Sequence, residues 1–236
     1  MTLDSNQTEE QLLSTVQQEY KILAEYKMVE SEKLSGIYVI PSYENSKIWF
    51  GVLFVRSGIY NGAIFRFNIL LPDNFPDDKI LPSVVFQNEI FHPLVCPYTG
   101  TCDLSFAFQE WRKGVDHVWH ILKLVQLLFA DVTEASKFTN KYSNPEAADL
   151  MTNNFGKFSE KAVESMSLSK EKIYDPPSSH DPHYIAFESF QEDIHRSVIE
   201  KILQKKDIIE KPNVPSHLGL SWVKEGEFKA LSKEDL

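Results

Sequence analysis

The residues of this chain best suited to chemistry lie close together, between His92 and Asp103, with Cys96 and Cys102 between them. A histidine, two thiols and a carboxylate are metal-ligand types, and a thiolate can act as a nucleophile. The spacing matches no structural zinc pattern, because the segment has no Cys-x-x-Cys pair. We therefore expect no metal and no other cofactor, and we expect His92 to fix the loop by hydrogen bonding and packing.

Two further groups of polar residues have simpler interpretations. Asp73, Asp77 and Asp78 flank a Phe-Pro turn, and aspartate is favoured in turns because its side chain bonds the nearby backbone. His117 and His120 are three residues apart, which places them near one another on a helix. With no acidic or cysteine partner near them in the sequence, both histidines are expected at the surface or at a helix end.

The elements that must position these residues begin with a helix. Thr8 and Gln11 match a capping box, in which each side chain bonds an amide that the first helical turn leaves unpaired. The apolar residues at helical spacing behind them are Leu12, Leu13, Val16, Tyr20 and Leu23. Turn signals then separate four strand-like runs over residues 36–40, 47–56, 63–71 and 83–87. Spacing this short, with no helical pattern between the runs, predicts an antiparallel meander.

A long loop precedes further helices. Residues 88–115 show neither a helical nor a strand period, and their aromatic content favours an ordered, functional loop over disorder. An amphipathic helix is predicted over residues 118–130, with Asp116 as its cap. Asn144, followed by a proline, opens another helix that we expect to continue to residue 162.

The composition excludes several classes of protein. The chain has 236 residues, of which 24 are basic and 34 acidic, and its net charge is −10. Because phosphate recognition needs a basic face, the acid excess argues against a nucleic-acid partner. The most apolar windows are far shorter than the roughly 20 residues of a membrane span, so we expect no integral membrane segment. With only two cysteines and no secretory signal, the chain is expected to be cytoplasmic.

The order of helix, four-strand meander, long loop and helices resembles the ubiquitin-conjugating enzyme fold. The motifs that carry the resemblance are Phe75-Pro76, the segment 81–86, Ile90-Phe91-His92-Pro93, Gly100, Trp111 and Asn144-Pro145-Glu146-Ala147-Ala148. It covers roughly residues 10–165. It implies an α+β fold with an N-terminal helix, a four-stranded antiparallel meander, a long loop and C-terminal helices, followed here by a C-terminal extension.

The resemblance breaks at the chemistry of that family. Active members have an asparagine directly after His-Pro, where this chain has Leu94, and the place of their nucleophilic cysteine, counted from Gly100, holds Asp103. A carboxylate cannot carry a thioester. Leu94 has no donor for the oxyanion, and losing one such donor typically costs about 10²–10³ in rate. The sequence is thus similar to inactive variants of the family, and more narrowly to the fused-toes (Akt-interacting) group with its insect crossbronx members.

The chain continues beyond this resemblance. We expect a flexible start over residues 1–8, a conjugating-enzyme-like domain over 9–172, a linker over 173–184 and an extension over 185–236. The extension is predicted to hold an amphipathic helix over 185–203 and an apolar docking peptide, which either fold back on the domain or dock on a partner. The candidate partner contacts in it are Phe187, Phe190, Ile194, Val198, Ile202, Trp222 and Phe228.

Three functions remain open. The first is a non-catalytic scaffold, and the resemblance to the fused-toes group implies adaptor complexes with Hook-type proteins that link cargo membranes to microtubule motors. The second is a non-covalent cofactor of conjugation that binds ubiquitin or an active conjugating enzyme. The third is residual catalysis through Cys102, which needs an exposed electropositive setting that Asp103 opposes. The resemblance also implies a basic first helix for meeting the activating enzyme, whereas this one is acidic, with Glu19 and Glu25 among its acids.

Overall fold

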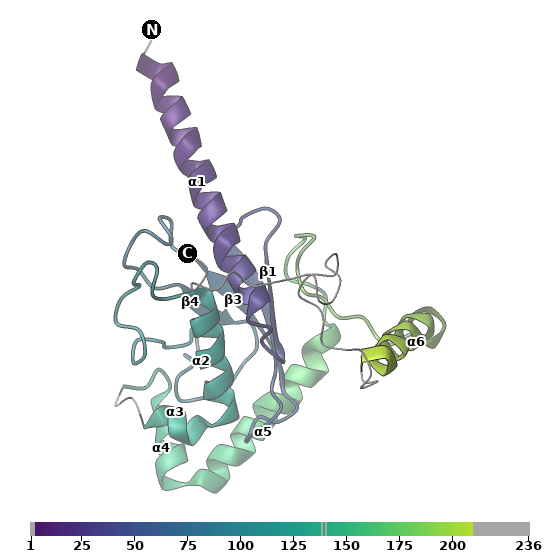
Figure 1. Ribbon diagram of the computed structural model, residues 1–236. Coiled ribbons are helices and arrows are strands. Elements are labelled where there is room, and N and C mark those ends of the chain that lie inside the picture. Colours follow the sequence, from purple (N-terminus) through teal and green to yellow (C-terminus); the bar gives the residue numbers. More distant parts are fainter. Residues whose placement is uncertain (1–2, 138, 140, 210–236) are drawn as a thin grey trace, which may run out of the picture. The chain divides into compact units, whose positions relative to one another are not determined.

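The computed structural model describes residues 3–137, 139 and 141–209, and the chain divides into two compact units, Met1–Glu188 and Ser189–Leu236 (Figure 1). The second unit contains helix α6 (Glu192–Ile209). The first unit contains α1 (Leu3–Ser31), β1 (Ile37–Pro41), β2 (Ile48–Phe54), β3 (Ile64–Leu70), β4 (Ser83–Phe86), α2 (Val118–Ala130), α3 (Val132–Ser136), α4 (Pro145–Asn153), α5 (Phe155–Glu171) and the 3-10 turn η1 (Lys172–Tyr174). Among the described residues, no helix is long and apolar enough to cross a bilayer.

The four strands form one antiparallel sheet in the order β1-β2-β3-β4, which confirms the predicted meander. Successive side chains of a strand point to opposite faces, and the register decides which residues share a face. Leu53 lies opposite Phe65, and Trp49 lies opposite Ile69. These four side chains are almost fully buried, so this face of the sheet is the one turned toward the core.

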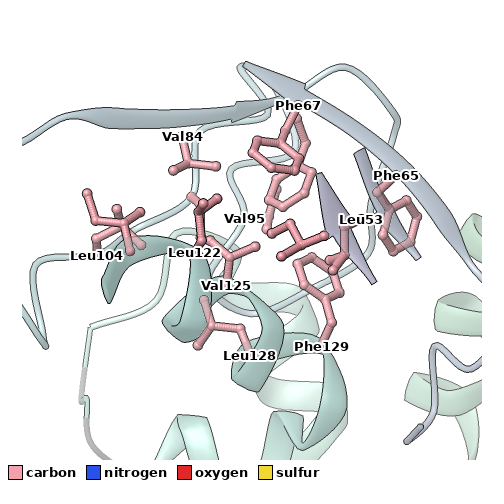
Figure 2. Packing of buried hydrophobic residues seen from close by; sticks show 14 of the residues in the cluster. Leu53, Phe65, Phe67, Val84, Val95, Leu104, Leu122, Val125, Leu128 and Phe129 are labelled. Carbon is pink, nitrogen blue, oxygen red and sulfur yellow. The ribbon is translucent and has the colours of Figure 1, made fainter. Parts of the chain in front are cut away.

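Helix α2 covers that face of the sheet. Figure 2 shows Leu122, Val125 and Phe129 of α2 beside side chains of the strands, and the Phe129 ring lies 5.2 Å from that of Phe65. Burying each large apolar side chain stabilises a fold by about 1.5–3 kcal/mol. The predicted amphipathic stripe of this helix is confirmed by its buried residues, which are Val118, Ile121, Leu122, Val125, Leu128 and Phe129.

The opposite face of the sheet is covered by the end of α5 and by residues 175–188, which we call the strap. The Tyr184 ring packs 5.1 Å from that of Phe50, and the Phe187 ring lies 6.2 Å from that of Phe54. The guanidinium of Arg66 sits 5.3 Å from the centre of the Phe187 ring. These contacts hold the strap along strands β2 and β3.

An aspartate fastens the strap at the turn between β1 and β2. The Asp181 carboxylate accepts hydrogen bonds from the Ser42 hydroxyl at 2.6 Å and from the amides of Tyr43 and Glu44 at 3.2 Å. Burial opposes ionisation of Asp181, but these bonds, together with one from the His183 amide, outweigh it and lower the pKa to about 2. The stretch 173–184, predicted as a linker, is therefore bonded to the sheet rather than spanning freely.

Two helix boundaries differ from the prediction. Helix α1 begins at Leu3 and runs through Thr8, so Thr8 lies inside the helix and cannot be its cap. The helix predicted from Asn144 to residue 162 is interrupted. Asn144 does cap it, accepting a bond from the Ala147 amide at 3.1 Å, but this helix, α4, ends at Asn153, and the side chain of Asn154 then caps α5. Asparagine favours such caps because its side chain substitutes for the missing backbone acceptor.

Candidate functional site

The candidate site is built on the loop after His-Pro, and His92 anchors that loop in the core. The His92 side chain is fully buried, and its ring lies 4.9 Å from that of Phe129. Its Nδ1 accepts from the Leu94 amide at 3.0 Å, so Nε2 carries the proton and donates to the Leu128 carbonyl at 3.1 Å. Burial lowers the His92 pKa to about 4, which keeps the ring neutral. The predicted structural role of His92 is confirmed.

A glycine turn brings the two arms of the loop together. Gly100 has φ +70°, and a Cβ atom there would lie 2.2 Å from the Phe86 carbonyl oxygen, so only glycine fits. The Cys96 amide donates to the Thr101 carbonyl at 2.9 Å, and the Asp103 amide donates to the Leu94 carbonyl at 2.8 Å. The turn therefore places Asp103 directly beside Leu94.

The two arms of the loop bury the side chains of Leu94 and Cys102, the two residues on which the question of conjugation chemistry depends. The Leu94 side chain is fully buried, and Cys102 is only 4% exposed. Burial, with a smaller contribution from the neighbouring Asp103 charge, raises the pKa of the Cys102 thiol to about 12. A thiol in this state is protonated and closed to a substrate, so it is a poor nucleophile.

The carboxylate of Asp103 lies at a shallow pocket of about 270 Å³, whose lining includes Pro82, Cys96 and Ser143. The Asp103 side chain is half-buried and accepts hydrogen bonds from the amide and the hydroxyl of Ser105, at 2.9 Å and 2.6 Å. These two bonds make a local turn, as is common for aspartate. The acid of the pocket is thereby used to fix the backbone.

Sequence reasoning missed the accessible thiol of this pocket, which belongs to Cys96. The Cys96 side chain is partly exposed and free, and it shares the pocket with Asp103. Hydrogen bonding from the Thr99 hydroxyl, and from the backbone amides of Tyr98 and Thr99, lowers the pKa of Cys96 below its ordinary value. Only the closed Gly100 turn brings the two arms into one pocket, so the linear spacing carried no signal for it.

The two histidines at the start of α2 find an acidic partner that is remote in the sequence. Glu25 of α1 is 6% exposed, and its carboxylate lies 2.9 Å from His117 Nδ1 and accepts from the Val118 amide at 3.1 Å. The His117 amide donates to His120 Nδ1 at 3.0 Å. The predicted helix-end position is confirmed, but the N-cap residue is His117, and Glu25 accepts from the first amide of the helix. Asp116 instead accepts from the amide and guanidinium of Arg112.

The predicted partner contacts fall into three groups. Phe187 lies in the strap and packs on the sheet, outside the helix in which it was predicted. Helix α6 begins only at Glu192, so Phe190 precedes it as well. The side chains of Phe190, Ile194, Val198 and Ile202 are 52–61% exposed. Trp222 and Phe228 lie outside the described residues.

The sheet topology and the His-Pro loop define a class of protein, the ubiquitin-conjugating fold. The family model "Ubiquitin-conjugating enzyme" matches residues 17–166. A solved ubiquitin-conjugating enzyme domain of Toxoplasma gondii superposes with a TM-score of 0.52 at 21% identity, covering 63% of this chain and 95% of that one. At that identity, the match shows the fold alone.

This chain belongs to the ubiquitin-conjugating enzyme family. It is 54% identical to "Protein crossbronx" of Drosophila ananassae over 99% of this chain and 100% of that protein. It is 52% identical to "Protein crossbronx" of Drosophila persimilis over 99% of both chains. The expected relationship to insect crossbronx proteins is confirmed. Among the described residues, no three His, Cys, Asp or Glu side chains gather as a metal site would require.

Proposed function

We propose that this chain is a non-catalytic variant of the ubiquitin-conjugating fold that acts as a cytoplasmic scaffold in Hook-type vesicle-trafficking complexes. The proposed loss of activity rests on two side chains of the loop that follows His-Pro. Leu94, which has no hydrogen-bond donor in its side chain, fills the core, and Asp103 stands at the pocket where a thiolate would be needed. Thioester transfer needs both a thiolate and oxyanion donors.

Helix α6 supports the scaffold role. Its exposed apolar side chains recur every four residues, at Ile194, Val198 and Ile202, and therefore form one stripe. An apolar stripe of this kind fits an amphipathic helix that docks in a hydrophobic groove or on another helix. A Hook-type coiled-coil protein offers such a surface, and the resemblance to the fused-toes group suggests it as the partner.

The proposal is tested by affinity capture of the full chain from cell lysate with identification of the recovered proteins. We expect a Hook-type protein to be recovered by the wild-type chain and reduced at least 10-fold with Ile194→Glu, Val198→Glu and Ile202→Glu combined. The matched control is Arg196→Glu with Gln204→Glu, which changes the charge of α6 by the same amount off the stripe. Recovery of no Hook-type protein, or equal loss in both variants, would contradict the proposal.

A further inference from the structure

Helix α1 carries an exposed apolar seam that the proposed function does not use. The helix has 29 residues, which corresponds to a length of about 43 Å. Among its described side chains, Ile22 is the first buried one, and Gln18 bonds the domain through the Asp73 and Phe75 carbonyls. Figure 1 shows the preceding turns projecting beyond the sheet.

The seam has the spacing of a coiled-coil interface. Leu13, Val16, Tyr20 and Leu23 follow one another at intervals of three, four and three residues, which are the a and d positions of a heptad. Their side chains are 59%, 43%, 70% and 50% exposed. They lie on the side of the helix opposite Ile22, Glu25 and Val29, which face the domain.

A groove runs along one side of this seam. Val16, Tyr20 and Leu23 line it from α1, Pro41 lines it from the end of β1, and Ser46 lines it from the turn between β1 and β2. Its volume is about 380 Å³. A helix laid against the seam would rest one flank on this turn, so the groove extends the contact beyond α1 alone.

The charges beside the seam select the partner. The acids on its two flanks are Glu10 and Glu19, at the positions that choose partners in coiled coils. No basic side chain of the described residues forms an ion pair with either, and Glu19 accepts a hydrogen bond from the Ser46 hydroxyl at 2.8 Å. Lys21 and Lys27 of the same helix are already paired, with Asp77 and Glu30. Two copies of α1 would therefore bring acids together, whereas a basic helix would complement them.

We propose that the exposed seam of α1 docks an amphipathic helix of a partner protein whose apolar a and d positions are flanked by lysine or arginine. A helical segment without a packed face is marginal in water, and apolar packing is the usual source of helix stability. The docked partner supplies that packing. The inference stands on α1 and does not depend on the role of α6, so the two proposals fail independently.

The test uses the full chain and two labelled 21-residue peptides, followed by fluorescence anisotropy. Both peptides carry leucine at a and d, and they differ only in lysine or glutamate at e and g. We expect the lysine peptide to bind at least 10-fold more tightly than its glutamate twin. Glu10→Lys with Glu19→Lys should reverse that preference. Equal binding of both peptides, or no binding of either, would overturn the proposal.

A matched pair of variants separates docking from simple charge attraction. Val16→Glu with Tyr20→Glu should weaken the lysine peptide at least 10-fold. Ile80→Glu with Tyr98→Glu adds the same charge at exposed loop positions and should leave binding unchanged or slightly tighter. Unchanged binding by the first variant would overturn the proposal. So would a dimer of the wild-type chain in sedimentation equilibrium that the first variant dissolves, because the occupant would then be a second copy.

Discussion

The His92–Ser105 loop and helix α6 use their apolar residues in opposite ways. In the loop, Leu94 and Cys102 are buried and the backbone is closed by hydrogen bonds between its arms. On α6, Ile194 and Ile202 are each 61% exposed. The difference teaches that the loop buries its apolar side chains and bonds its own backbone, whereas α6 leaves its apolar side chains available for contacts. The predictions below test that contrast from the largest effect to the smallest.

Replacing Leu94 by asparagine should destabilise the domain strongly. Leu94→Asn removes a fully buried apolar side chain and buries an amide, and we expect a loss of about 2–4 kcal/mol in the free energy of unfolding. Val198→Asn makes a comparable change on exposed α6 and should stay within about 0.5 kcal/mol. Urea unfolding measures both. Equal effects of the two substitutions would erase the contrast between loop and helix.

The buried His92 should make stability depend on pH. Its pKa of about 4 in the folded chain lies below the ordinary 6.5, so the unfolded chain binds the proton more readily. The stabilisation is complete above about pH 6.5 and is lost as the pH falls toward 4. We expect the unfolding free energy to be about 2 kcal/mol lower at pH 5 than at pH 7 from this group.

Two measurements check the His92 prediction. His92→Gln should remove that part of the pH dependence, which urea unfolding at the two pH values would reveal. An NMR titration of the wild-type chain should show no protonation of the His92 ring between pH 7 and pH 5.5. A ring that titrates near pH 6.5 would show that the loop leaves this histidine in contact with water.

The smallest predicted effect is local and concerns the strap. Hydrogen bonds hold the Asp181 pKa at about 2, against an ordinary 3.8, so they favour the bonded strap above about pH 4. That stabilisation should fade as the pH falls from 3.8 toward 2. Asp181→Asn should increase hydrogen exchange at the Tyr43 and Glu44 amides at neutral pH, while Asp175→Asn should not. Unchanged exchange in both variants would mean that the strap is held by its aromatic contacts alone.

Local patterns in the sequence predicted much of the fold. Short strand-like runs bounded by turn signals located the four strands, and Asn144 before Pro145 located a helix start, because each signal acts within a few residues. The role of His92 also followed from its type and its place in the loop. These features depend on neighbours in the sequence.

The features that the sequence did not reveal depend on residues that meet only after folding. Glu25 was predicted as one acid of a charged helix, but it is buried and accepts from the first amide of α2, 93 residues away. Asp181 looked like part of a polar linker, yet it finds Ser42 139 residues earlier in the chain. Cys96 reaches the pocket of Asp103 only because Gly100 turns the chain back. No local pattern encodes such partners.

The most direct test of the central claim is a charging assay with ubiquitin, its activating enzyme and ATP, resolved without reductant. We predict no reductant-sensitive adduct on the wild-type chain, while an active conjugating enzyme in parallel is charged. Cys96→Ser and Cys102→Ser should look the same as wild type. A reductant-sensitive ubiquitin band on the wild-type chain that disappears in either cysteine variant would contradict the account, and the variant would identify the thiol responsible.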